Sequence, residues 1–172
     1  SLVKKLEELG IGRPSTYASI ISVLKMRNYV EVEKNRFIPE DRAILITAFL
    51  KGFFGQYVDY EFTASMEESL DEITSGKIKW TDFLEKFWNG FSSNVVSVTD
   101  LRITNVFDSL NEILKNHIFE KSTDNETSVS RACPSEGCKG LLSLKVSRFG
   151  AFVGCSDYPE CKFTRPISYK KI

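Results

Sequence analysis

The sequence predicts a multidomain protein in which a mostly α-helical domain with a winged-helix-like start precedes a small β domain. Three observations lead to this fold class. Residues 1–40 show the order helix, tight turn, helix and β-hairpin. Apolar side chains then recur at helical spacing as far as residue 119. All four cysteines follow residue 128, among glycines and short apolar runs.

Charge is balanced over the whole chain but not along it. The 172 residues carry 23 basic and 23 acidic side chains, yet residues 129–172 hold eight basic against three acidic ones. The C-terminal part therefore has a net charge of +5, and residues 1–128 have −5. A cationic tail attracts polyanions, whereas the larger part must bind any phosphate through local geometry.

The same residues disfavour a membrane or secreted protein. No run approaches the ~18 apolar residues that a membrane span requires. Residues 1–9 are amphipathic and do not have the pattern of a signal peptide. We therefore expect a cytoplasmic protein without a membrane partner.

The N-terminal elements follow from periodicity and from turn residues. Apolar positions predict a first helix over residues 2–9, which a glycine-rich turn ends. A second helix is expected to begin at Ser15 or Thr16 and to end near Asn28. Alternating polarity predicts a hairpin after it, with strands at residues 29–32 and 36–39. This order is typical of a winged-helix module.

Further helices are expected along the rest of the N-terminal part. The periodic segments are residues 42–54, 66–74, 81–89 and 91–119. Thirteen phenylalanines supply material for one mostly α-helical core, and packing explains these rings better than cofactor stacking. Residues 120–128 are polar and separate two regions of different composition, so they predict a linker. The predicted domains are residues 1–119 and 129–172.

The four cysteines form two close pairs. Four residues separate Cys133 from Cys138, five separate Cys155 from Cys161, and sixteen lie between the pairs. Two such loops can bring four thiolates to one ion, and zinc accepts tetrahedral sulfur ligation. Short strands are expected at residues 141–146, 151–153 and 162–167. The pattern predicts a C4 zinc ribbon with a structural zinc ion, since four sulfur ligands leave no position for a catalytic water.

Two disulfides or four unliganded thiols are the alternatives to zinc. Paired short spacings are unusual for unliganded cysteines, and nothing in the sequence marks the chain as secreted. A domain of about forty residues also buries too little surface to fold alone. Structural zinc contributes on the order of 10 kcal/mol to such a domain. Zinc is therefore the favoured prediction.

Aromatic and basic side chains interleave in the predicted ribbon. The rings are Phe149, Phe152, Tyr158 and Phe163, and the cations beside them are Arg148, Lys162 and Arg165. This composition is typical of a platform that stacks the bases of single-stranded nucleic acid and binds its phosphates. A small domain also needs rings to cover its metal site, so we expect part of the set to be structural. The predicted DNA contacts are Arg148, Phe149, Phe152 and Phe163.

The glycine-rich turn before the second helix is a candidate anion site. Arg13, Ser15 and Thr16 stand at the helix N-terminus, where free N–H groups and the helix dipole favour negative charge. Arg27 follows Thr16 by eleven residues, which returns it to within ~20° of the same face, about 16 Å along the axis. That span could fit a few consecutive phosphates. The alternative is that Ser15 is only an N-cap and the glycines only end a helix.

Three segments resemble one family. Residues 2–21 contain Gly-Ile-Gly-Arg-Pro-Ser-Thr-Tyr-Ala and closely resemble the bacterial DNA topoisomerase I family, the type IA topoisomerases. Residues 60–67, Tyr-Glu-Phe-Thr-Ala-Ser-Met-Glu, look like a segment of the same family. Residues 133–164 are similar to its C-terminal zinc ribbons. The three matches occur in the order that the family has.

The resemblance implies that residues 1–119 are the helical part of the type IA core that grips the single strand near the cleavage site. It implies DNA contacts for Arg13, Ser15, Thr16 and Arg27. In the family, a tyrosine cleaves one strand through a 5′-phosphotyrosine link, another strand passes, and religation leaves negative supercoils relaxed. The magnesium-binding domain and the domain with that tyrosine have no match here. We therefore expect a C-terminal fragment without catalytic residues, in which Tyr17 is not the nucleophile and magnesium belongs to the parent enzyme.

Two other functions remain open at this point. A winged-helix regulator would read duplex DNA with the helix of residues 16–27 in a major groove. A docking module would bind a partner such as RNA polymerase through the ribbon. Our expectation is a monomeric, nucleoid-associated segment that binds single-stranded DNA and that neither cuts nor relaxes DNA alone.

Overall fold

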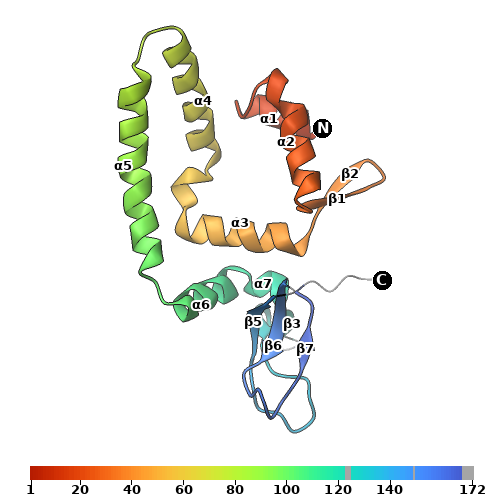
Figure 1. The fold of residues 1–172 in the computed structure, drawn as a ribbon. Coiled ribbons are helices and arrows are strands. Elements are labelled where there is room, and N and C mark those ends of the chain that lie inside the picture. Colours follow the sequence, from red (N-terminus) through yellow and green to blue (C-terminus); the bar gives the residue numbers. More distant parts are fainter. Residues whose placement is uncertain (123–124, 149, 168–172) are drawn as a thin grey trace.

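The chain forms an arch of helices with a small β domain at one end (Figure 1). This computed structural model describes residues 1–122, 125–148 and 150–167. The elements of the arch are α1 (Leu2–Glu8), α2 (Pro14–Met26), β1 (Val30–Glu33), β2 (Arg36–Pro39), α3 (Asp41–Phe53), η1 (Gly55–Tyr57), α4 (Tyr60–Thr74), α5 (Trp80–Thr99), α6 (Ile103–Ile113) and α7 (Lys115–Ile118). The remaining strands are β3 (Glu120–Ser122), β4 (Asn125–Ser130), β5 (Leu142–Ser147), β6 (Gly150–Cys155) and β7 (Thr164–Arg165).

The winged-helix-like order at the start of the chain is confirmed. The second helix begins at Pro14, whose missing N–H has no helical partner at this position and whose fixed φ suits the first turn. Strands β1 and β2 pair antiparallel around Lys34 and Asn35, which adopt the positive φ that a tight hairpin turn requires. Helix α2 ends at Met26, so the predicted boundaries hold to within two residues.

Helix α4 begins earlier than the sequence predicted. The Asp59 carboxylate accepts hydrogen bonds from the N–H groups of Glu61 and Phe62 at 2.8 and 3.4 Å. This cap satisfies donors of the first turn, so the helix starts at Tyr60 instead of Met66. An aspartate directly before the helix, with Glu61 in its first turn, is an N-terminal signal that the sequence did contain.

The predicted helices over residues 81–89 and 91–119 are divided differently in the structure. Helix α5 continues through Gly90, which adopts helical geometry and lies beside the Tyr57 hydroxyl. The interruptions come instead at Asp100 and Leu114. Valine and threonine are poor helix formers and dominate the turn before Asp100, which weakens the helix there.

The buried core lies where the arch meets the β domain. Its most buried hydrophobic members come from α3, α6, the end of α7 and the strands: Ala48, Leu110, Leu114, Ile118, Phe119, Leu142, Leu144, Val153 and Ile167. Helices α1, α2, α4 and α5 contribute no fully buried residue. The prediction of one core within the helices is therefore wrong. The arch is a single row of helices, so each one leaves a side uncovered in this chain (Figure 1).

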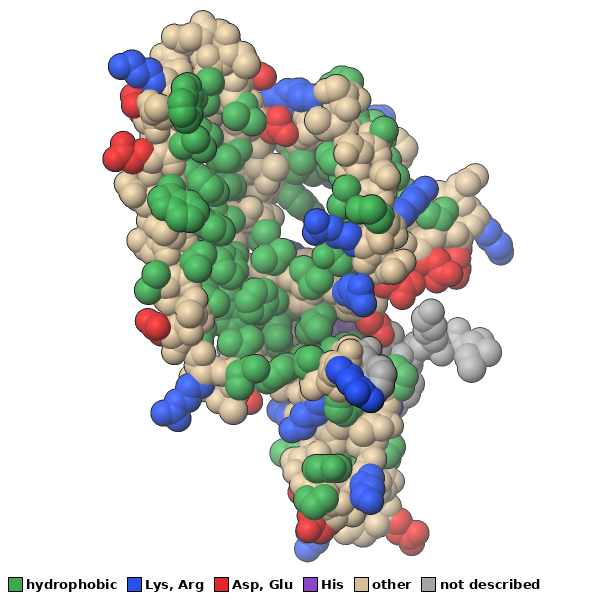
Figure 2. Space-filling model, in the orientation of Figure 1, with side chains coloured by type: hydrophobic (Ala, Val, Ile, Leu, Met, Phe, Trp, Pro, Cys, Tyr) green, Lys and Arg blue, Asp and Glu red, His purple; other side chains and the backbone are tan. Residues whose placement is uncertain are grey.

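Aromatic rings hold the corner at which α3, η1, α4 and α5 meet. Tyr57 lies edge-on to Phe62, Phe87 and Phe91, with ring centroids 5.4, 6.0 and 5.2 Å apart. Such pairs contribute about 0.5–1.5 kcal/mol beyond the area that they bury. These phenylalanines serve packing, as predicted. Trp80 and Trp88 of α5 stay exposed. Hydrophobic side chains gather along this arm of the arch on the face that Figure 2 shows.

The arch and the β domain are also joined by polar contacts. Asn111, a buried residue of α6, accepts a hydrogen bond from the Leu144 N–H of β5 at 2.8 Å. The Arg131 guanidinium lies 5.1 Å from the centre of the Phe119 ring. Strands β3 and β4 pair antiparallel across the segment predicted as a linker. The boundaries 1–119, 120–128 and 129–172 stay a prediction, but the two sides share one core.

No helix in the described part of the chain is long and apolar enough to cross a membrane.

Candidate metal centre and nucleic-acid interface

The four cysteine sulfur atoms converge on one point. All lie within 4.8 Å of one another. The Sγ atoms of Cys133 and Cys161 are 3.7 Å apart, and those of Cys138 and Cys155 are 3.6 Å apart. Zinc–sulfur bonds of about 2.3 Å in a tetrahedron place neighbouring sulfur atoms about 3.8 Å apart. The cluster therefore fits one structural zinc ion, which is the cofactor that the sequence predicted.

Backbone N–H groups and one glycine shape this centre. The Gly140 N–H donates to Cys138 Sγ at 3.4 Å, and the Asp157 N–H donates to Cys155 Sγ at 3.5 Å. Donors of this kind stabilise negative sulfur and orient the ligands. A side chain at Gly140 would lie 2.5 Å from Cys155 Sγ, so only glycine permits the two loops to approach.

The thiols differ in how readily they ionise when no metal is bound. The Phe163 N–H, followed by the Ser135 hydroxyl, lowers the pKa of Cys161 to about 7. The Gly140 N–H favours the Cys138 thiolate, but burial and the neighbouring thiols raise the pKa of Cys138 to about 12. A cation that binds all four sulfur atoms at neutral pH must therefore displace protons.

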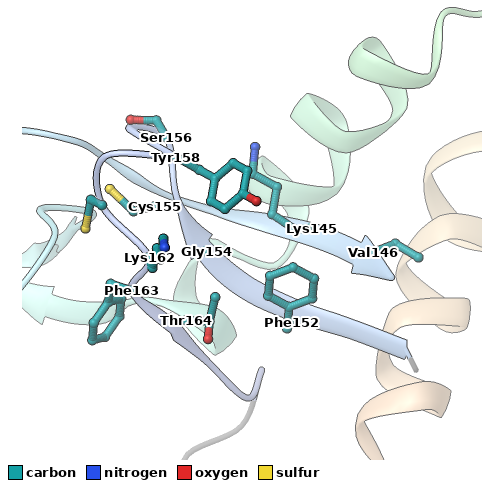
Figure 3. Close-up of a pocket in the computed structure, with 11 residues that line it drawn as sticks. Lys145, Val146, Phe152, Gly154, Cys155, Ser156, Tyr158, Lys162, Phe163 and Thr164 are labelled. Carbon is teal, nitrogen blue, oxygen red and sulfur yellow. The ribbon is translucent and has the colours of Figure 1, made fainter. Parts of the chain in front are cut away.

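A groove runs along the outer face of the ribbon sheet. Lys145 of β5 stands opposite Phe152 of β6, while the adjacent pair, Leu144 and Val153, is buried on the other face. The groove has a volume of about 490 Å³. Its lining includes Lys145, Val146, Phe152, Tyr158, Lys162 and Phe163 (Figure 3). Phe152 and Phe163, two of the predicted DNA contacts, thus lie in one site with two lysines.

The sequence interpretation missed Lys145 and misplaced Arg165. The position of Lys145 follows from strand register, since residues directly opposite one another share a face. Arg165 was expected beside the phosphates, but its guanidinium donates to the carbonyls of Ile118 and Pro166 and ties β7 to α7. Arg148 is exposed just after β5. Phe149 lies outside the described residues.

The turn before α2 depends on glycine. Gly12 is buried with a φ of 74°, in the left-handed region that other residues rarely adopt. A side chain there would lie 3.1 Å from the ring of Tyr17 and 3.2 Å from the Ile20 side chain. The Gly12 N–H instead donates to the Glu67 carboxylate of α4 at 3.0 Å. The corner at the start of α2 therefore binds an anion, and that anion is the Glu67 carboxylate of the chain itself.

Arg13 and Thr16 close the first turn of α2. The Arg13 N–H donates to Thr16 Oγ1 at 2.9 Å, and this hydroxyl donates back to the Arg13 carbonyl at 3.0 Å. Arg13 is thus the N-cap residue, and the alternative that Ser15 caps the helix is wrong. Ser15, Thr16 and Arg27 have exposed side chains. The first two lie at the start of α2, whereas Arg27 is its C-cap.

The Arg13 guanidinium is held by two acids of α4. Its Nη2 donates to Asp71 Oδ2 at 2.7 Å, and its Nη1 lies 3.6 Å from Glu67 Oε2. Nη1 also donates to the Gly12 carbonyl at 2.8 Å. The hydrogen bond to Asp71 raises the pKa of Arg13, so the guanidinium stays charged. Sequence patterns contained no signal for these partners, which lie 54 to 58 positions away in the chain.

Comparisons with known proteins agree with this geometry. The family model described as DNA topoisomerase matches residues 1–85, and the one described as topoisomerase DNA binding C4 zinc finger matches residues 130–170. The chain is 55% identical over 168 residues to DNA topoisomerase 1 of Rickettsia typhi, covering 97% of this chain and 21% of that protein. The chain is 50% identical over 166 residues to DNA topoisomerase 1 of Zymomonas mobilis, and the match covers 96% of this chain and 13% of that protein.

A solved structure shares the fold as well. Full-length topoisomerase I from Thermotoga maritima superposes with a TM-score of 0.63 at 29% identity, covering 99% of this chain and 24% of that one. The chain thus spans about a fifth of the length of several curated relatives. The matches do not favour the duplex regulator or the RNA polymerase docking module. With a DNA-binding C4 zinc ribbon at one end and the topoisomerase match at the other, the chain belongs to the bacterial DNA topoisomerase I family.

Proposed function

We propose that this chain holds single-stranded DNA for a type IA topoisomerase. The groove of the ribbon carries the proposal, because it combines the rings of Phe152 and Phe163 with the ammonium groups of Lys145 and Lys162. Rings accept bases of any sequence, and flanking cations follow the phosphates. The start of α2 adds a second site, where Arg13, Ser15 and Thr16 stand together at the positive end of the helix dipole.

The whole protein, by this proposal, cleaves one DNA strand transiently, passes another strand through the break and religates it. Negative supercoils relax as a result. The support is the shared family, whose named relatives are DNA topoisomerases. The chain alone is expected to leave a supercoiled plasmid unchanged in the presence of magnesium, because none of its residues matches the family's nucleophile. We further propose that it acts as a monomer on chromosomal DNA in the cytoplasm.

Substitution of Arg13 or Arg27 by alanine tests the site at α2. Each variant is expected to bind a single-stranded oligothymidylate more weakly, with a salt dependence lower by about one unit of slope, because each phosphate contact releases counterions from DNA. Fluorescence anisotropy over a salt series measures both quantities. Arg102→Ala, at the far end of the arch, is the matched control and should keep the original slope.

Competition between single-stranded and duplex DNA of the same sequence separates this function from that of a duplex regulator. Preference for the single strand supports the proposal. An unchanged slope in both Arg13→Ala and Arg27→Ala, or a preference for the duplex, contradicts it.

Loss of an aromatic ring from the ribbon groove should also weaken binding of single-stranded DNA. Phe152→Ala is expected to reduce affinity for the oligothymidylate by about 1–3 kcal/mol, the typical contribution of one stacked base. Phe152→Trp should restore most of it, because an indole also stacks. Zinc content, measured in parallel, shows that the ribbon is intact. Equal affinity of the alanine variant and the original chain would show that Phe152 is a packing residue only.

A further inference from the structure

The start of α2 is already engaged with two carboxylates. Glu67 accepts the Gly12 N–H at 3.0 Å, and Asp71 binds Arg13 at 2.7 Å. Both acids lie on α4, one turn apart, so the corner that is proposed to bind DNA is attached to the opposite arm of the arch (Figure 1). With one guanidinium and two carboxylates, the group has a formal charge of −1. An approaching phosphate therefore meets net repulsion as long as both acids remain.

The two carboxylates differ in how easily another anion can displace them from the start of α2. The Glu67 side chain is 26% exposed and bonds a buried backbone N–H, whereas the Asp71 side chain is 67% exposed and bonds only a guanidinium, among the described contacts. An exposed ion pair in water is weak, because the solvent screens it and both side chains lose freedom. Loss of the Gly12–Glu67 bond would instead leave a buried donor without a partner. Asp71 is thus the acid that can be exchanged.

Carboxylate and phosphate oxygens bind a guanidinium in the same way. A carboxylate is planar and a phosphate is tetrahedral, but both accept charge-assisted hydrogen bonds from N–H groups, and arginine recognises either one. The Nη2 group that now donates to Asp71 is the donor that faces away from the Gly12 carbonyl, to which Nη1 is bound. A phosphate at this corner would compete with Asp71 for that donor.

We propose that Asp71 is an exchangeable counter-ion of Arg13. In the DNA-free protein it holds the guanidinium ready at the start of α2, and a phosphate of the bound strand takes its place. Glu67 meanwhile keeps the corner attached to α4. Asp71 is a positioning residue that lowers the affinity of the site, which favours release of the strand after each cycle. This inference rests on the proposed function of Arg13 as a phosphate contact.

The test measures binding of an oligothymidylate about 15 nucleotides long, matched to typical single-strand site sizes, to variants of the whole chain. Asp71→Asn removes the charge and keeps the shape. It is expected to bind about two- to fivefold more tightly, the range that an exposed ion pair provides. Glu72→Gln removes the same charge from the next residue, which has no described ion pair, and should change the affinity less than Asp71→Asn does.

Arg13→Ala provides the second control. In that background, Asp71→Asn should lose its gain, because no guanidinium remains to be released. Thermal unfolding distinguishes the two acids: Glu67→Gln should lower the midpoint, and Asp71→Asn should leave it nearly unchanged. A midpoint that falls equally for both would overturn the division of roles, and so would an affinity gain for Glu72→Gln equal to that for Asp71→Asn.

The outcomes separate this inference from the function on which it rests. If Arg13→Ala weakens binding and Asp71→Asn leaves it unchanged or weaker, the exchange is wrong and the phosphate contact stands. If Arg13→Ala has no effect on affinity or salt dependence, the phosphate contact itself is wrong. A gain for Asp71→Asn that disappears without Arg13 supports both.

Discussion

Removal of zinc is expected to unfold the β domain. Cys155→Ala deletes a ligand that is 3% exposed, and structural zinc contributes on the order of 10 kcal/mol to small domains. The variant should lose the ion, and the amides of β5 and β6 should exchange with solvent within the dead time of a hydrogen-exchange experiment. Elemental analysis should give one zinc per original chain and much less for the variant.

Two controls make this result specific. Glu160→Gln changes an exposed side chain between the last two cysteines and should keep the zinc. Zinc returned to chelator-treated protein should restore protection of the strands. Full amide protection in the metal-free chain would contradict the role of the ion.

The zinc affinity should also depend on pH in a known direction. Protons compete with zinc for the sulfur atoms, and the pKa of Cys138 lies at about 12 in the metal-free cluster while that of Cys161 is about 7. Binding at neutral pH therefore releases protons, so affinity rises with pH and falls on acidification. Calorimetry in buffers of different ionisation enthalpy measures the number released.

Ile118→Ala is expected to lower the free energy of unfolding by a large amount. The side chain is 1% exposed, in the core that the arch and the ribbon share. Truncation of such a residue typically costs about 2–5 kcal/mol, because it removes apolar contacts and leaves a cavity. Urea unfolding, followed by circular dichroism and by zinc release, should show the loss with both probes. Ile103, which is 71% exposed, provides the matched control, and Ile103→Ala should stay within about 0.5 kcal/mol of the original chain.

A shift seen by only one of the two probes would mean that the arch and the ribbon unfold independently. Such a result would contradict the shared core, although each part could still be folded. Coincident shifts would show that the C-terminal boundary of the helical part is not a flexible joint.

Local patterns in the sequence were sufficient for the elements whose chemistry is itself local. Two cysteine pairs with short spacings predicted the metal centre, and the geometry of the sulfur atoms confirms it. The glycine-rich turn, Pro14 and the alternating residues after α2 predicted the winged-helix-like order. In each case the outcome depends on the spacing of two cysteines, on the backbone angles that glycine and proline permit, or on a periodicity of a few residues. All of these act between neighbours in the chain.

The tertiary structure alone decided what depends on distant partners. It placed the core at the junction with the ribbon, let α5 pass through Gly90, and turned Arg165 toward the carbonyl of Ile118. It also brought Glu67 and Asp71 to the start of α2. Sequence by itself determined which groups can bind metal or anions, because that is a property of residue type and spacing. Which groups actually meet depends on contacts between segments more than 40 residues apart, and only the folded arch specifies those.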